Sequence, residues 1–251
     1  MRGLGDIKKW LLSWIVDLHD NVTFYRAPDV LTAKEALQFR ALVRWGDGET
    51  TLAYERSTTF QSENSQLALE LKAVINNPSP DVLLCFIPKL VQRRPFRGQT
   101  TKYRRFWTLT AFMMRRSRRR HQTADALMFR KEGNFEGLTP LLQRLGQVQR
   151  VLVVSANPKD ARDLEAKLAR HSAGVRVSHV LVPKVNAYGV RDALFTQLKS
   201  QHPPPDIALL SAGPVGKCLV PDLLALWPTS SQIVDTGHLF DHLSQQLKTQ
   251  A

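Results

Sequence analysis

The chain has 251 residues, of which 43% are hydrophobic and 23% charged, so it can bury a substantial core and has the composition of an ordinary globular protein. No apolar stretch approaches the ~20 residues that a membrane-spanning helix needs, which argues against a transmembrane protein. The two cysteines, Cys85 and Cys218, lie in apolar runs and predict buried thiols in a reducing compartment, so we expect a cytoplasmic location.

The first predicted element is an amphipathic helix within residues 1–20. Between residues 6 and 19, Trp10, Trp14 and their apolar neighbours recur at helical spacing and define one face. Such a face either packs on the rest of the protein or lies at a membrane interface with Lys8 and Lys9 near the headgroups. The residues alone leave both interpretations open.

The next elements alternate between helix and strand. A helix is predicted over 32–41, with Thr32 as N-cap and Glu35 three residues later as its capping-box partner. A short apolar strand follows at 41–45 and breaks at Gly46. A second helix covers 65–76, and a buried strand covers 81–88.

The net charge of +13 is concentrated in one segment, residues 89–131. This basic segment, which we predict to be partly helical, contains fourteen lysines and arginines and one acidic residue, Asp125. A patch of this kind predicts an anionic partner, which can be nucleic acid, a phospholipid surface or an acidic substrate. Composition does not choose among them.

The second half of the chain predicts a parallel sheet. Strands at 150–157, 175–183, 206–213 and 231–237 alternate with helices at 159–171, 190–201 and 217–226, a pattern typical of βαβ units. We therefore expect an α/β fold with a mostly parallel sheet flanked by helices. Ligands in such sheets bind beyond the carboxyl ends of the strands.

The most informative polar segment follows the strand at 41–45 and contains Arg44, Gly46, Asp47, Gly48 and Glu49. Two carboxylates one residue apart can converge on a hard divalent cation, which keeps open positions for phosphate oxygens. The glycines are expected to allow positive φ and close approach of a ligand. A simple hairpin is the alternative, since Asp-Gly is a common turn dipeptide.

Three further polar turns follow predicted strands. Asn186, Ala187 and Tyr188 open a helix, where backbone amides can bind an anion. A glycine-containing turn that opens a helix and carries a lysine is typical of phosphate binding, and the chain has such a turn at Gly213, Pro214 and Lys217. Its spacing is not that of a nucleotide-triphosphatase motif. Asp235 and His238 end the last strand and are candidates for a base or a sugar contact. All four segments fall where one site would assemble.

Taken in order, these four segments resemble the glycosyltransferases of the GT-D fold, a bacterial family long catalogued as a domain of unknown function. The segments are Arg44-Trp45-Gly46-Asp47-Gly48-Glu49, Asn186-Ala187-Tyr188, Gly213-Pro214-Val215-Gly216-Lys217 and Asp235-Thr236-Gly237-His238. The resemblance runs from about residue 36 to 241. The chain departs from the family at Trp45, where Phe or Tyr is usual, at Ser155-Ala156-Asn157-Pro158, and in its arginine-dense insert at 93–120.

The resemblance implies a Rossmann-like α/β fold in a single domain over 21–251, with the basic segment 89–131 inserted. It also implies a hexosyltransferase that uses a nucleotide-sugar, with UDP-hexose expected, and Mn²⁺ or Mg²⁺. Asp47 and Glu49 would be the metal-binding D-x-E carboxylates, with Arg44, Gly46 and Gly48 around them. Asn186, Ala187 and Tyr188 match the nucleotide-side turn; Gly213, Pro214 and Lys217 match the phosphate-side turn; Asp235 and His238 match the last motif.

The acceptor implied is a glycan, a glycoprotein or a lipid-linked sugar. The basic segment and the N-terminal helix then suggest peripheral contact with the inner face of an anionic membrane. The alternative is a basic nucleic-acid-binding α/β protein. We favour the enzyme because no helix-turn-helix, zinc or RNP-like motif is visible and the excess charge lies in one insert.

Overall fold

The computed structural model describes residues 29–54, 56–76, 79–87, 122–130, 135–169, 174–237 and 239–240. The predicted N-terminal helix at 6–19, most of the basic segment and His238 lie outside these residues. No helix in the described part of the chain is both long and apolar enough to cross a bilayer.

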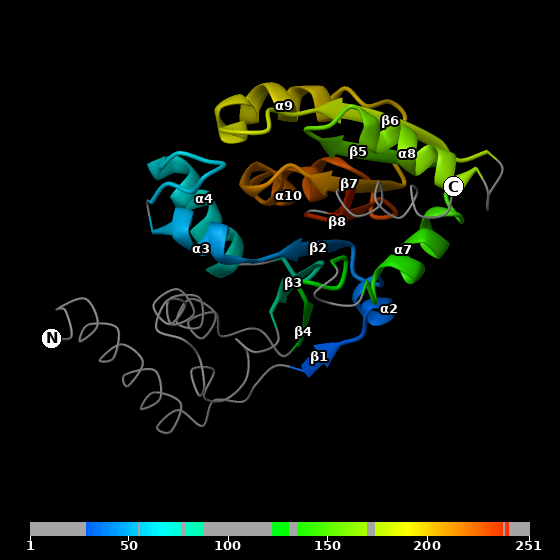
Figure 1. The fold of residues 1–251 in the computed structure, drawn as a ribbon, viewed down its shortest axis with the longest axis horizontal. Helices are drawn as coiled ribbons and strands as arrows, with labels where there is room; N and C mark the ends of the chain where they lie inside the picture. The colour runs from blue at the N-terminus through cyan, green and yellow to red at the C-terminus, as the bar shows by residue number, and fades with distance from the viewer. Residues whose placement is uncertain are drawn as a thin grey trace, which may run out of the picture.

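The fold is built on one sheet of eight parallel strands in the order β1-β4-β3-β2-β8-β7-β5-β6 (Figure 1). This confirms the predicted Rossmann-like parallel sheet. The strands are β1 (Asp29–Leu31), β2 (Ala41–Arg44), β3 (Val82–Phe86), β4 (Gln122–Asp125), β5 (Arg150–Ser155), β6 (Arg176–Leu181), β7 (Ile207–Ser211) and β8 (Gln232–Asp235).

Helices cover both faces of this sheet. They are α2 (Ala33–Ala36), α3 (Asp47–Ala53), α4 (Ser65–Asn76), α7 (Leu138–Leu145), α8 (Lys159–Leu168), η2 (Ala187–Val190), α9 (Arg191–Lys199) and α10 (Pro214–Leu226). Side chains of a strand alternate between its two faces. Leu152 and Val154 therefore join one apolar core with α3, α4, α9 and α10, whereas Val151 and Val153 join a second with α2, α7 and α8.

Several elements differ from the sequence predictions. The helix expected over 32–41 is only the four-residue α2, although its capping box is present: the Thr32 amide donates to Glu35 Oε2 at 2.8 Å. The segment after β2 is neither a hairpin nor an open turn, because Asp47 begins helix α3. The described end of the basic segment forms strand β4, which was not predicted, and the part of that segment expected to be helical, around 106–116, lies outside the described residues. Strand β1 and helix α7 were not predicted.

The strand order determines which polar turns meet. β8 lies between β2 and β7, so the turns that follow these three strands are neighbours at the carboxyl edge of the sheet. β6 is the last strand on one side of the sheet, and β7 and β5 lie between it and β8. The turn after β6 is therefore not an immediate neighbour of the other three.

Candidate active site

Asp235, the last residue of β8, connects two of the strand ends. Its Oδ2 accepts a hydrogen bond from the Arg44 backbone amide at 3.1 Å, at the end of β2. Its Oδ1 accepts one from the Gly237 amide at 3.2 Å. The carboxylate is buried, so it fixes the ends of β2 and β8 relative to each other.

Lys217 brings the third strand end to the same point. Its ammonium group lies 3.0 Å from Glu49 Oε1 and 2.9 Å from Asp235 Oδ2, and it donates to the Gly213 carbonyl at 3.4 Å. An ammonium group has three donors, and three acceptors surround this one. Helix α10, which carries Lys217, is thereby tied to α3 and β8. We call Glu49, Lys217 and Asp235 the buried triad.

The buried triad is charged despite its burial. Burial opposes the protonated form of Lys217, but Asp235 and Glu49 outweigh it and raise the pKa of the ammonium group. Burial likewise opposes ionisation of Glu49, but Lys217 and the Gly46 amide lower the pKa of this carboxyl. One cation between two carboxylates leaves a net charge of −1 in a low-dielectric environment.

The two carboxylates of the D-x-E segment differ in their surroundings. Glu49 Oε2 accepts a hydrogen bond from the Gly46 amide at 2.8 Å, so both of its oxygens have protein partners. Asp47, at the start of α3, is exposed. Its carboxylate forms no hydrogen bond or ion pair with any residue that the structure describes. The segment therefore presents one carboxylate to solvent and keeps the other inside.

Trp45 anchors the start of α3 in the core. Its side chain is fully buried, and its indole nitrogen donates to Thr50 Oγ1 at 2.9 Å. A buried indole needs such an acceptor, and Thr50 supplies it one turn into the helix. The tryptophan thus fixes how α3 leaves the sheet and where Asp47 lies.

The glycines of the site do not act as the sequence suggested. Gly46 has φ −120° and precedes the helix, and Gly48 lies within it, so the predicted positive φ at these positions is wrong. A Cβ on Gly46 would lie 3.2 Å from Glu49 Oε2, which is a tight contact. Positive φ occurs instead at Gly213 (+60°), which precedes α10, and at Gly237 (+54°).

Arg44 lies beside this centre and is held by backbone groups. Its Nε donates to the Ala126 carbonyl, in the turn after β4. Its guanidinium group lies against Gly237, where any Cβ would overlap it. Gly237 therefore has two reasons to lack a side chain, its positive φ and this close approach.

The turn after β6 contributes to a different part of the same edge. Asn186 Oδ1 accepts from the Ser62 amide at 2.8 Å, and the Tyr188 amide donates to Gln61 Oε1 at 3.2 Å. Ala187 and Tyr188 are buried. This turn holds the loop between α3 and α4, and none of its hydrogen bonds reaches the buried triad.

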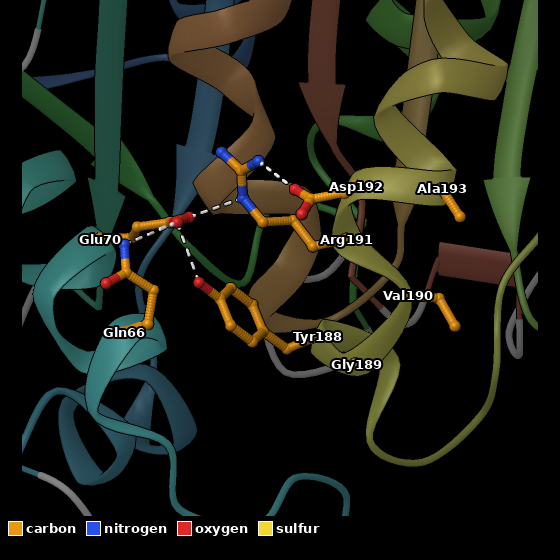
Figure 2. A pocket seen from close by; sticks show the side chains of 8 residues that line it. All are labelled: Gln66, Glu70, Tyr188, Gly189, Val190, Arg191, Asp192 and Ala193. Atoms are coloured by element: carbon orange, nitrogen blue, oxygen red, sulfur yellow. Dashed lines mark hydrogen bonds and ion pairs between the residues drawn. The ribbon is translucent and has the colours of Figure 1, made fainter.

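A second ionic network, which sequence reasoning missed, lies next to Tyr188 (Figure 2). Arg191 contacts three carboxylates: Nε lies 2.9 Å from Glu70 Oε2, Nη1 3.0 Å from Asp192 Oδ1 and Nη2 2.7 Å from Asp222 Oδ2. The Tyr188 hydroxyl donates to Glu70 Oε1 at 2.9 Å. We call these four charged residues the Arg191 network. Glu70 and Asp222 stand in no recognisable motif.

The donor set can be compared with the needs of a divalent cation. No group of three or more His, Cys, Asp or Glu side chains in the described ranges could enclose a metal. Mg²⁺ and related ions are instead often bound through one or two carboxylates together with substrate phosphates and water. Asp47, exposed at the carboxyl edge, fits such a site. Glu49 fits less well in this arrangement, since one of its oxygens accepts a hydrogen bond from the Gly46 amide and the other is paired with the Lys217 ammonium group.

The comparisons with known proteins agree with this architecture. The fold resembles a solved structure described as the highly conserved domain of unknown function 1792 with a distinct glycosyltransferase fold, at a TM-score of 0.69 and 19% identity over 97% of this chain and 86% of that one. It also resembles a new glycosyltransferase (DUF1792) from Streptococcus sanguinis, at a TM-score of 0.65 and 20% identity over 89% and 86% of the two chains.

No curated protein matches the sequence significantly. The family model "Glycosyltransferase GT-D fold" matches residues 42–245. This range includes Asp47, Glu49, Lys217 and Asp235 and covers most of the chain. With the parallel sheet and its polar carboxyl edge, it shows that this chain belongs to the GT-D fold glycosyltransferase family.

Proposed function

We propose that this glycosyltransferase moves a hexose from UDP-hexose to a hydroxyl group of a glycan, a glycoprotein or a lipid-linked acceptor, with Mn²⁺ or Mg²⁺ as cofactor. The observation that carries the proposal is the division of the D-x-E pair. Asp47 is exposed at the carboxyl edge of the sheet, while Glu49 is held inside by Lys217 at 3.0 Å.

In this proposal Asp47 is the protein ligand of the cation. The cation, when bound, neutralises the charge that develops on the departing nucleoside diphosphate. Glu49, Lys217 and Asp235 are positioning residues, because their contacts join α3, α10 and β8. Holding these three elements still keeps the Asp47 carboxylate in place, and preorganised charge of this kind costs no rearrangement during the reaction.

The phosphate-side role expected for Lys217 is revised accordingly. Its three donors already face Glu49, Asp235 and the Gly213 carbonyl. Asp235 is likewise a poor candidate for a general base, since both of its oxygens accept hydrogen bonds. Donor contact by Gly213 and Pro214 stays a prediction. Base catalysis by His238 also stays a prediction, since His238 lies outside the described residues.

The direct test is release of nucleoside diphosphate from a panel of UDP-, GDP- and TDP-sugars, with and without Mn²⁺. We expect turnover of a UDP-hexose that requires the cation and falls about 100-fold in Asp47→Asn, as for loss of one preorganised electrostatic group. Glu165→Gln is the matched control, because Glu165 is an exposed acid on α8, which packs on the opposite face from α10. Cation-independent turnover, or full activity of Asp47→Asn, would contradict the proposal.

The basic segment supports a peripheral role at the cytoplasmic face of an anionic membrane, which we propose together with the enzyme activity. Neutralising Arg115, Arg116, Arg118, Arg119 and Arg120 is expected to weaken binding to anionic liposomes or to an acidic acceptor in a salt-sensitive way. Donor hydrolysis should persist. Unchanged binding would dismiss this role.

The nucleic-acid alternative is tested by thermal shift. A ligand that binds only the folded state raises the melting temperature. UDP with Mn²⁺ is expected to stabilise the protein, whereas oligonucleotides alone are not. Stabilisation by any oligonucleotide without an effect of UDP would favour the alternative.

A further inference from the structure

A polar pocket of about 520 Å³ lies between α4 and the start of α9, beside the Arg191 network (Figure 2). Its lining includes Gln66, Glu70, Tyr188, Gly189, Arg191 and Asp192. We propose that this pocket binds a neutral, hydroxyl-rich ring, either the ribose of the donor nucleoside or a sugar of the acceptor, and that it excludes the diphosphate. The inference rests on the proposed function and assigns a substrate group to this part of the site.

The charge of the pocket disfavours phosphate. Arg191 is the cation of the lining, and each nitrogen of its guanidinium group is paired with a different carboxylate. Glu70, Asp192 and Asp222 contribute three negative charges against that one positive charge. The Arg191 network therefore carries a net charge of −2, and a diphosphate would approach against this field.

The same groups are suited to hydroxyl donors. The Asp192 side chain is 94% exposed, and only its Oδ1 is paired with Arg191 in the described structure. Its other oxygen can accept a hydrogen bond from a ring hydroxyl, and bonds to a carboxylate are among the stronger ones. The Gln66 amide carries both donors and an acceptor, so it can bond to a hydroxyl in either sense.

The pocket also has room for a ring. A Cβ built on Gly189 meets no atom within 4 Å, so this part of the lining faces open space. Val190, also in the lining, is 36% exposed and offers an apolar surface. Carboxylate, amide and a small apolar surface together match a ring that has hydroxyl groups at its edge and C–H groups on its face.

Helix α10 connects the Arg191 network beside the pocket with the buried triad. Helix α10 carries Lys217 of the buried triad and Asp222 of the Arg191 network. Five residues of α-helix span about 7.5 Å along the axis. Cys218 lies between Lys217 and Asp222 in the sequence. Burial and the neighbouring Glu70 carboxylate raise the pKa of its thiol. The two charged clusters therefore lie within about one and a half turns of each other along one helix.

The test measures binding of uridine, methyl β-glucoside and inorganic pyrophosphate by ligand-observed NMR titration. Gly189→Leu adds a side chain that fills the open space, and Asp192→Asn removes the exposed charge at the pocket. Glu165→Gln serves as the control on the opposite face. We expect the wild type to bind uridine or the glucoside. The affinity for that ligand should fall at least fivefold in both pocket variants and stay unchanged in the control. Pyrophosphate is not expected to compete.

The two arms identify the source of the ring. Variant-sensitive binding of uridine assigns the pocket to the donor ribose, and variant-sensitive binding of the glucoside assigns it to the acceptor. The inference is overturned if neither ligand responds to the two variants or if pyrophosphate displaces the bound ring. Sugar-nucleotide turnover by the same proteins is read separately: its absence in the wild type, with variant-sensitive binding intact, overturns only the proposed function.

Discussion

The buried triad around Lys217 and the network around Arg191 both draw on helix α10, yet solvent reaches them very differently. Side-chain exposure is 5% for Lys217, 13% for Glu49 and 5% for Asp235. In the Arg191 network it rises from 21% for Glu70 to 41% for Asp222 and 94% for Asp192. The first set holds three elements together, and the second leaves acceptor oxygens facing solvent.

This contrast separates positioning from ligand contact. Removing the partner of a buried charge lowers the free energy of unfolding strongly. Removing the partner of an exposed charge lowers it little, because water screens the exposed charge. Substitutions in the buried triad should therefore act first on stability. Substitutions in the Arg191 network should act first on ligand binding, with small effects on folding.

The largest expected effect follows Lys217→Met. The change leaves two buried carboxylates, Glu49 and Asp235, without their cation, which should lower the free energy of unfolding by about 3–5 kcal/mol. Urea denaturation at pH 7 measures it. Adding Glu49→Gln to Lys217→Met should recover part of the loss, because one unpaired charge is removed; no recovery would mean that Lys217 acts through packing alone.

Gly237→Ala is the next largest change. A Cβ here would overlap the Arg44 guanidinium group, and the residue has φ +54°. Positive φ alone costs a side chain about 1–2 kcal/mol, so we expect a loss of about 2 kcal/mol or more once Arg44 has moved. Gly48→Ala is the matched control, since a Cβ there has nothing within 4 Å. Equal stability of the two variants would contradict the packing of Arg44 on Gly237.

The pH dependence of stability should differ between the wild type and Lys217→Met. In the wild type the pKa of Glu49 is lowered, so its contribution is present above its unfolded pKa of about 4.3 and is lost as pH falls through the folded value. The pKa of Lys217 is raised, so its contribution is lost only as pH rises through its folded value, above about 10. Between these limits the triad's contribution is flat.

Without Lys217 the sign reverses for Glu49, because burial, no longer offset by the ammonium group, then raises the pKa of its carboxyl. A native state that binds more protons than the unfolded state loses stability as pH rises. We therefore expect Lys217→Met to be destabilised further between pH 5 and pH 7.5, by about 1–2 kcal/mol, relative to the wild type. If the free energy of unfolding changed with pH in the same way in the two proteins across this range, the variant would not hold a buried charged carboxylate.

Arg191→Lys should have the smallest effect. Lysine keeps the charge but cannot contact three carboxylates in the guanidinium geometry. These pairs are partly exposed, so we expect a loss of about 1 kcal/mol at most. Thermal denaturation in low and high salt measures it. A loss comparable to that of Lys217→Met would remove the distinction between the two networks.

The sequence predicts the parallel sheet, and the carboxyl edge at which the candidate site lies, better than it predicts the side-chain contacts within that site. The strands and helices after residue 150 alternate with clear apolar runs, and three polar turns meet because β2, β8 and β7 are neighbours. Strand β4 was missed because its sequence is polar, and its buried Thr123 is satisfied by the Leu84 carbonyl at 2.8 Å. Helix α3 was missed because a Gly-Asp-Gly start resembles a turn.

The Arg191 network was not predictable from local patterns. Arg191 lies 121 residues from Glu70 and 31 from Asp222, and only the packing of α4, α9 and α10 brings them together. The division between Asp47 and Glu49 has the same origin. Spacing placed two carboxylates in one turn, but Lys217, 168 residues after Glu49 in the printed sequence, determines which one faces inward.

The most direct test of the account compares Asp47→Asn with Glu49→Gln by titrating Mn²⁺ in the presence of UDP-sugar, each protein being held well below its own melting temperature. The account predicts that Asp47→Asn loses most of the Mn²⁺-stimulated turnover and that any remaining turnover needs a higher Mn²⁺ concentration to reach its midpoint. Glu49→Gln should keep the wild-type Mn²⁺ midpoint despite its lower stability. The account is contradicted if the Mn²⁺ midpoint moves in Glu49→Gln and stays unchanged in Asp47→Asn.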